Sequence, residues 1–404
     1  MANVPMMSPA LRTGLALAAC GAVALLAGCG SSSSGKGGKT LGFAVVGWRT
    51  SVYETPYMDE CPDGLAQGND ELWWKGVPPE ERAMLTRDGT IEPVTGTRRA
   101  MSVLRGPKGE DVCWHPTSVK DPPLRVVEGD TSYGLDLDGD ATGKGTPMSC
   151  PHVNFKSPDG RPGIDNQVYR ILGCTYGWRR HGYIEDNANG ERRDTSHGIV
   201  LIEVSGVDDP LNDEQVEVAF LKKFDGDTLP KDNRADVLPH ATYRADPTPR
   251  YGGKARGRIV NGMLETDPID VTLPFYGNLT HLPLVMKGMR MQLPVNKTER
   301  FVEGQIAGYQ DLANFWDYIQ RYEYLLVTGQ FSCPGIYVAM KELADGYPDP
   351  KTGECTALSA AFTIRTVPAF IEHGDNEPSG VVKPVVTQVA STKDVASTKD
   401  GVKR

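Results

Sequence analysis

Short stretches in which apolar and polar residues alternate recur along the chain, most clearly from residue 198 onward. In 215–221 the positions Val216, Val218 and Phe220 are apolar, which is the spacing of a strand that buries one face. Turns rich in Gly, Pro and Asn separate these stretches, as is typical of connections between neighbouring strands. The pattern predicts strands at 41–48, 198–204, 215–221, 258–265, 269–273, 282–293, 300–308 and 361–367.

Four segments have the features of helices instead. Apolar residues recur three or four positions apart in 164–174, which carries Asp165 early and Gly173 near its end. A stripe in 311–327 is apolar and largely aromatic; core packing is the usual role of such a stripe, and ligand binding is the rarer alternative. Shorter helices are predicted at 78–85 and 337–343.

Successive strands with short connections indicate an antiparallel sheet. The 45 glycines and 30 prolines favour turns over long helices. We therefore expect a mainly β fold, an antiparallel sandwich or a barrel-like sheet with a few short peripheral helices, with an α+β fold as the alternative. The β-rich body is expected at 41–372, with 41–132 as a loop-rich lead-in subdomain.

An export signal precedes this body. Arg12 is followed by an apolar run that is short for a membrane span and closes on Leu26-Ala-Gly-Cys29. This ending resembles the lipobox of bacterial lipoproteins, in which the cysteine is acylated and becomes the new N-terminus. The alternatives are an ordinary cleavable signal and a transmembrane anchor.

The lipobox resemblance implies a signal peptide at 1–28 and attachment to the membrane through a lipid on Cys29. Several acyl chains on one residue give stable anchoring. Gly30 follows the cysteine, where an aspartate would resemble an inner-membrane retention signal, so we expect the outer membrane, with the body on its periplasmic face or at the cell surface. Residues 29–40, rich in Gly and Ser, are predicted to be a flexible tether.

The C-terminal residues 373–404 contain the hexamer Val-Ala-Ser-Thr-Lys-Asp twice in tandem, at 389–394 and 395–400. Two copies of a polar hexamer have too few apolar side chains to bury a core. We predict a disordered tail.

Six cysteines remain once Cys20 is removed with the signal peptide and Cys29 is acylated. An even number in an exported chain indicates disulfide bonds, and the sequence contains neither Cys-x-x-Cys metal-site spacing nor a Cys-x-x-Cys-His haem site. Six cysteines permit many pairings, and we expect neighbours in sequence to pair. The expected bonds are Cys61–Cys113, Cys150–Cys174 and Cys333–Cys355.

The formal net charge of -9 argues against nucleic-acid partners. An acidic surface repels phosphate backbones, and no cluster of basic residues is interleaved with aromatic ones. The chain also lacks a Gly-rich phosphate loop and a dinucleotide fingerprint, so no nucleotide cofactor is expected.

Aspartates occupy alternate positions in the segment that precedes Cys150. Asp136, Asp138 and Asp140, followed by Thr142, resemble the opening of an EF-hand-type calcium loop, since oxygen donors two residues apart can surround a Ca²⁺ ion. We therefore consider calcium a candidate cofactor, with these four residues as its ligands. A solvated acidic turn without metal is the alternative.

This segment departs from the EF-hand pattern at two positions. The sixth position is Ala141 rather than glycine, and the twelfth is Pro147 rather than the bidentate glutamate. Further ligands would have to come from elsewhere, and the nearest candidates are Asp159, Asp165 and Asn166.

Signatures of common hydrolases are missing. There is no Gly-x-Ser-x-Gly elbow and no His-Glu-x-x-His motif, and the seven histidines occur singly. No catalytic residue is assigned, and the lack of these motifs favours a protein that is not an enzyme. A pair of carboxylates for glycan hydrolysis remains the alternative, because their spacing in space is invisible in a sequence.

Two blocks, Gly163-Ile-Asp-Asn-Gln167 and the segment 198–206 with its Asp-rich turn, are similar to segments of uncharacterised exported proteins of Gram-negative bacteria. That resemblance implies no activity. We expect a cell-envelope lipoprotein that acts as a binding or assembly module for a protein or glycan partner. An envelope-side glycan hydrolase is the second hypothesis, and an accessory subunit of an envelope complex, without electron carriers of its own, is the third.

Overall fold

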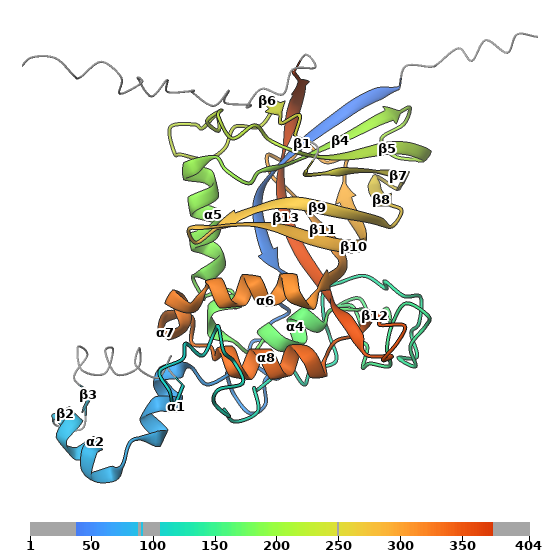
Figure 1. Cartoon of the computed structure of the whole chain (residues 1–404). Coiled ribbons are helices and arrows are strands. Elements are labelled where there is room, and N and C mark those ends of the chain that lie inside the picture. Colours follow the sequence, from blue (N-terminus) through green and yellow to red (C-terminus); the bar gives the residue numbers. More distant parts are fainter. Residues whose placement is uncertain (1–37, 88–89, 92–105, 249, 375–404) are drawn as a thin grey trace, which may run out of the picture. The chain divides into compact units, whose positions relative to one another are not determined.

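The alternating stretches form strands of one continuous, mostly antiparallel sheet (Figure 1). The computed structural model describes residues 38–87, 90–91, 106–248 and 250–374. All of them belong to one compact unit that begins at Gly38. The strands of the sheet are β1 (Lys39–Thr50), β4 (Val200–Val207), β5 (Asp213–Lys222), β6 (Ala241–Ala245), β7 (Gly253–Val260), β8 (Met263–Thr266), β9 (Ile269–Gly277), β10 (Thr280–Pro294), β11 (Val302–Asp311), β12 (Gly346–Pro348) and β13 (Cys355–His373).

The sheet closes on itself because β1 pairs with both β4 and β13. The order of pairing is β1–β4–β5–β7–β8–β10–β11–β13, and β13 returns to β1 with Phe43 opposite Pro368 and Thr50 opposite Phe362. Strand β9 pairs with β10, β12 pairs with β13, and β6 runs parallel to β13. The predicted mainly β, barrel-like fold with a few short helices is therefore confirmed.

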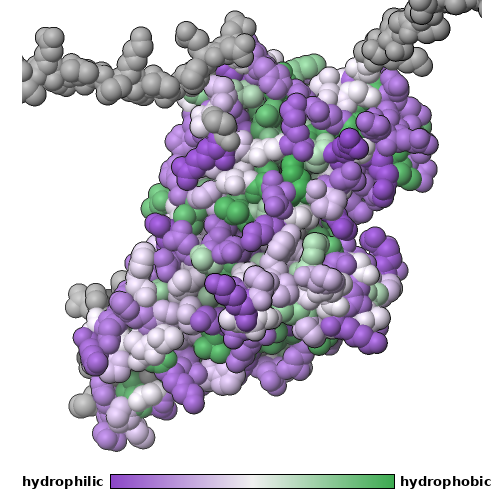
Figure 2. All heavy atoms as spheres, turned by 45° about the vertical axis from the view of Figure 1, so that its right-hand side comes forward, coloured by the Kyte–Doolittle hydropathy of each residue, from purple (hydrophilic) through white to green (hydrophobic). Residues whose placement is uncertain are grey.

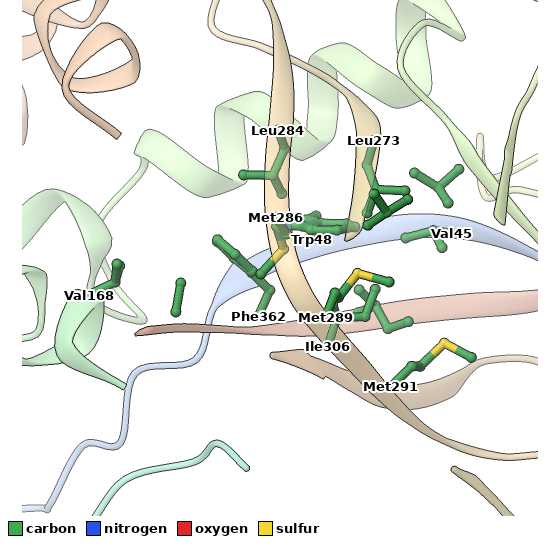
Figure 3. Close-up of a cluster of buried hydrophobic side chains, with 14 of the residues drawn as sticks. Val45, Trp48, Val168, Leu273, Leu284, Met286, Met289, Met291, Ile306 and Phe362 are labelled. Carbon is green, nitrogen blue, oxygen red and sulfur yellow. The ribbon is translucent and has the colours of Figure 1, made fainter. Parts of the chain in front are cut away.

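Apolar side chains fill the inside of the closed sheet (Figure 3). On β10, Met286, Met289 and Met291 are all fully buried, although alternation alone would turn Met289 away from Met286. The pairing register of β10 shifts between Met286 and Met289 against β9, and between Lys287 and Arg290 against β11. Gly288, which lies in this stretch, adopts a φ of 57°. This bulge restores the inward direction, so β10 contributes to the core along its whole length.

The outer face of β1 is also covered. Ala44 and Val46 point away from the interior and pack against Leu229, Val237 and Tyr243, which belong to the segment that follows β5. A strand buried on both faces needs an uninterrupted apolar run, and β1 has one at 43–46. The same segment carries β6, which fixes it to β13.

Short helices pack against one end of the sheet. Helix α4 contacts β13 and α8, and α6 contacts α8, β10 and β11 (Figure 1). No helix among the described residues is long and apolar enough to cross a membrane. The remaining elements are α1 (Asn69–Gly76), α2 (Pro79–Leu85), β2 (Thr86–Arg87), β3 (Thr90–Ile91), α4 (Gln167–Leu172), η1 (Tyr176–Trp178), α5 (Ile184–Thr195), α6 (Leu312–Arg321), η2 (Glu323–Leu325), α7 (Leu326–Gly329) and α8 (Cys333–Glu342).

Several elements differ from the prediction. The single strand expected at 258–265 is a hairpin of β7 and β8, because Asn261 and Gly262 take positive φ angles of 51° and 78° and turn the chain. The long helix expected at 311–327 ends at Arg321 and continues as η2 and α7. Helix α5 was not predicted, because its only aliphatic residues are Ile184 and Ala188.

All six cysteines form disulfide bonds, but the predicted sequential pairing is wrong. The bonds are Cys61–Cys174, Cys113–Cys333 and Cys150–Cys355, with Cα–Cα distances of 5.8, 5.1 and 6.1 Å. Each of them joins segments more than a hundred residues apart in sequence. Proximity along the chain was a poor guide, because the closed sheet brings distant loops together beside the helices.

Several predictions concern residues outside the described part of the chain. These are the signal peptide at 1–28, the lipid anchor at Cys29, the tether up to residue 37 and the tail from residue 375. They stay predictions.

Replacing the Cys113–Cys333 pair by serines should lower the free energy of unfolding by about 2–5 kcal/mol, because this bond closes a long loop of the unfolded chain. Denaturant unfolding of the full chain without reductant measures the effect. Peptide mapping of the unreduced wild type should recover Cys61 linked to Cys174. Recovery of Cys61 linked to Cys113 would contradict the observed pairing.

Candidate functional site

The predicted calcium loop is held together by its own aspartates. A carboxylate oxygen of Asp136 accepts from the Gly139 backbone N–H at 2.7 Å, and one of Asp138 accepts from the Asp140 N–H at 2.8 Å. Asp140 accepts in turn from the Thr142 N–H at 2.8 Å. Each aspartate thus caps the backbone two or three residues ahead, which explains why this turn is rich in aspartate.

Only one of the four predicted ligands joins a group of potential metal ligands. Asp138 lies with His152 and Asp165, and one ligand atom of each lies within 4.8 Å of the others. Asp165 is one of the further ligands that the sequence suggests, whereas His152 is not. Calcium bound by Asp136, Asp138, Asp140 and Thr142 stays a prediction. The structure groups Asp138 with His152 and Asp165 instead.

The centre of this group is the contact between His152 and Asp165. Nε2 of His152 lies 2.8 Å from Oδ1 of Asp165, whose other oxygen accepts from the Leu137 N–H at 2.7 Å. Nδ1 of His152 lies 2.8 Å from the carbonyl oxygen of Cys150. A carbonyl only accepts, so Nδ1 carries a hydrogen and Nε2 is the nitrogen that faces the carboxylate.

This environment favours a positive charge on the imidazole ring. Burial alone would lower the pKa of His152, but the hydrogen bonds to Asp165 and to the Cys150 carbonyl outweigh it and raise the pKa to about 9. Asp165 is fully buried, and a buried carboxylate requires such a partner.

A second buried carboxyl and a tyrosine lie next to this contact. Burial raises the pKa of Asp345 to about 7, and its oxygens accept from the backbone and hydroxyl of Ser359 at 2.7 and 2.6 Å. Tyr309 is 1% exposed, and its hydroxyl has no hydrogen-bond partner among the described residues. Burial, followed by the negative charges of Asp165, Asp345 and Asp138, raises the pKa of this hydroxyl.

Asn166 attaches this region to the closed sheet. Its amide nitrogen donates to the Ser51 carbonyl at 3.2 Å and to the Tyr133 carbonyl at 2.9 Å. Its oxygen accepts from the backbone of Tyr169, which caps α4, and from the Ala361 N–H of β13 at 3.2 Å. One buried side chain therefore connects the residues 133–166, which we call the acidic segment, to the end of β1, to α4 and to β13.

A polar cleft of about 540 Å³ lies beside the acidic segment. Arg258 pairs with Glu265 at 2.6 Å, and Arg290 donates to the Asp136 carbonyl at 2.7 Å. The third guanidinium, that of Arg161, pairs with a neighbouring aspartate at 3.1 Å. The lining residues are Leu135, Asp136, Arg161, Pro162, Ile164, Arg258, Glu265, Thr266, Asp267, Pro268, Arg290, Met291 and Gln292.

A narrow apolar cavity lies between the sheet and helices α5 and α6. Its volume is about 30 Å³, and aliphatic and aromatic side chains form most of its wall. One of them is Trp48, whose indole N–H has no partner among the described residues. Glu185 accepts from the Thr50 N–H at 2.6 Å, and Arg192 donates to the Tyr276 carbonyl at 2.6 Å. Burial raises the pKa of Glu185 to about 7.

Two residues of the site escaped the sequence analysis for identifiable reasons. His152 is an isolated histidine in a Cys-Pro-His turn, and Asp345 lies in a short loop between α8 and β12. The signal available in the sequence was a cysteine near each residue, Cys150 before His152 and Cys355 after Asp345, because the bond between these cysteines brings the two segments together. The expected sequential pairing placed Cys150 with Cys174 instead and so did not indicate this proximity.

No family model, no curated protein and no solved structure matches this chain. A function must therefore be inferred from the chemistry and geometry of the residues themselves.

The Glu185→Gln variant should change how stability depends on pH. The pKa of this carboxyl is about 7 in the folded protein against 4.5 for an ordinary glutamate, so the folded state retains a proton that the unfolded state releases. Stability therefore falls as pH rises from 4.5 to 7, and the loss is complete above 7. At pH 8 the variant should be more stable than the wild type by roughly 1–3 kcal/mol.

Denaturant unfolding at pH 5 and pH 8 measures this difference. The matched control is Asp186→Asn, the next residue of α5, whose exposed carboxylate pairs with Arg49 and whose replacement should change stability by about 0.5 kcal/mol or less. Equal pH dependence in the wild type and Glu185→Gln would contradict the raised pKa.

Proposed function

We propose that this protein is a cell-envelope binding module, tethered to the outer membrane through Cys29, that binds a neutral, hydroxyl-rich envelope glycan in the polar cleft. The observation that carries the proposal is the cleft, in which every arginine of the wall already has a partner. The envelope location is supported by the lipobox-like sequence and by three disulfides, which suit an oxidising compartment.

The size of the cleft suits a ligand of several sugar rings or a short peptide. Its volume of about 540 Å³ falls in the usual range for small-molecule sites. Its wall combines guanidinium groups, carboxylates and the Gln292 amide, which supply both donors and acceptors of hydrogen bonds.

The pairing of charges in the cleft favours a neutral ligand over an ionic one. Arg258 is neutralised by Glu265, and Arg290 is held by backbone carbonyls of the acidic segment. An anion would have to displace these contacts, whereas hydroxyl groups can hydrogen-bond at their outer edges. The visible surface is also largely hydrophilic, with apolar patches scattered over it (Figure 2).

Glycan hydrolysis is the second candidate, favoured by one observation in the same cleft. Burial raises the pKa of the Asp136 carboxyl, and the charges of Asp165 and Asp138 raise it further. Glu265, also in the wall, is ion-paired with Arg258. A carboxyl of raised pKa and an ion-paired carboxylate at the same site resemble the acid and base that cleavage of a glycosidic bond requires.

The Arg258→Ala variant should weaken glycan binding about tenfold, because it removes a charged hydrogen-bond donor and leaves Glu265 with the Gln292 amide as its partner in the wall. Binding of the full chain to soluble envelope glycan fragments, measured by calorimetry, tests this. Lys254→Ala is the matched control, since Lys254 is an exposed base on the same strand, paired with Glu217 outside the cleft.

Equal affinity of Arg258→Ala and the wild type would contradict binding in the cleft. Cleavage of the fragments that Asp136→Asn abolishes would favour the hydrolase instead. Binding of envelope proteins but no glycan would exclude the proposed ligand.

A further inference from the structure

The arrangement of His152 is that of a metal-binding histidine. Its Nδ1–H is fixed by the Cys150 carbonyl at 2.8 Å, and its Nε2 points into the group formed by Asp138 and Asp165. In protein metal sites, a backbone carbonyl commonly holds the second ring nitrogen and so directs the first toward the metal.

The spacing of the three ligand atoms fits one small cation. They lie within 4.8 Å of one another, and the His152 and Asp165 atoms are already 2.8 Å apart. A zinc ion binds nitrogen and oxygen at about 2.0–2.2 Å, so its ligands lie roughly 3–3.6 Å from one another. Shifts of less than about 1.5 Å would bring all three atoms to bonding distance.

Tyr309 provides an independent sign that the group surrounds something further. Its side chain is 1% exposed, and its hydroxyl lacks a hydrogen-bond partner among the described residues. The carboxylates of Asp165, Asp345 and Asp138 are the charges that act on this hydroxyl. Buried hydroxyls are nearly always satisfied, so a bound oxygen or a ligated carboxylate at this position would supply the missing acceptor.

We propose that Asp138, His152 and Asp165 form a partly buried structural site for a divalent transition metal ion of the zinc class, with the Tyr309 hydroxyl hydrogen-bonded to an oxygen in its coordination shell. One nitrogen and two carboxylate donors suit zinc, whereas calcium prefers oxygen donors alone. This site differs from the predicted calcium loop, because it shares only Asp138 with it and does not include Asp136, Asp140 or Thr142.

The location of the site gives the ion a structural role. All three ligands belong to the acidic segment, and His152 follows Cys150, which is bonded to Cys355 at the start of β13. An ion held by all three would join distant parts of this segment beside the disulfide that links it to β13. An open cleft of about 220 Å³, lined by His152, Arg170 and Glu342 among others, adjoins the histidine of the site.

The experiment measures zinc directly. The full chain, purified in detergent without chelators, is analysed by elemental mass spectrometry, stripped with a chelator and titrated with ZnCl₂ or CaCl₂ during thermal melts. We expect about one zinc ion per chain and a rise of several degrees in the unfolding midpoint with Zn²⁺ but not with Ca²⁺. Replacement by Co²⁺ should give the visible absorption of a mixed nitrogen and oxygen site.

The matched variants are Asp138→Asn and Asp136→Asn, two neighbouring aspartates of one turn. Asp138→Asn should weaken zinc binding by about 100-fold or more, while Asp136→Asn should bind as the wild type does. Both aspartate variants should keep a midpoint near that of the wild type after chelation, which separates loss of the site from misfolding. His152→Gln is the second test: it removes the partner of the buried Asp165, so its midpoint should be lower even after chelation, and Zn²⁺ should no longer raise it.

Three results would overturn the proposal. These are a wild type without zinc whose midpoint ignores Zn²⁺, equal loss of zinc in Asp136→Asn and Asp138→Asn, and a midpoint raised by Ca²⁺ alone. None of these outcomes depends on whether the polar cleft binds a glycan.

Discussion

The pairing of β1 with β13 is the constraint on which the rest of the structure depends. β13 is the longest strand, and it is bonded to β1, β11, β12 and β6. Without β1 the ladder would have two open edges and its interior side chains would meet water. Closure instead buries an apolar interior and leaves the ends of the strands, where the loops gather, as the sites for polar chemistry.

The acidic segment is built onto this closed sheet through β13. On β13, the Ala361 N–H donates to the side chain of Asn166, and the Ser359 hydroxyl accepts from the Gln167 N–H. The Cys150–Cys355 bond adds a covalent link at the start of the same strand. We infer that residues 133–174 are not an appendage: their polar groups are satisfied by the sheet, and the sheet would leave backbone N–H groups unpaired without them.

The sequence predicted the sheet better than the site. Alternation located β5, and an apolar run located β1, because burial of strand faces is a local property of the chain. The hairpin at Asn261–Gly262 was also encoded locally, but its Asn-Gly turn was overlooked within an apolar stretch. Helix α5 escaped because few of its residues are apolar.

The disulfides and the Asp138–His152–Asp165 group could not be predicted in the same way. They depend on which distant loops the closed sheet brings together, and spacing along the chain does not contain that information.

Native-state hydrogen exchange tests the central claim that the acidic segment and the sheet unfold as one. The amides of Leu137 and Ile164 should exchange with the same free energy as that of Ile364, which lies on β13 between β1 and β11. Much faster exchange of Leu137 and Ile164, with Ile364 still protected, would contradict the account.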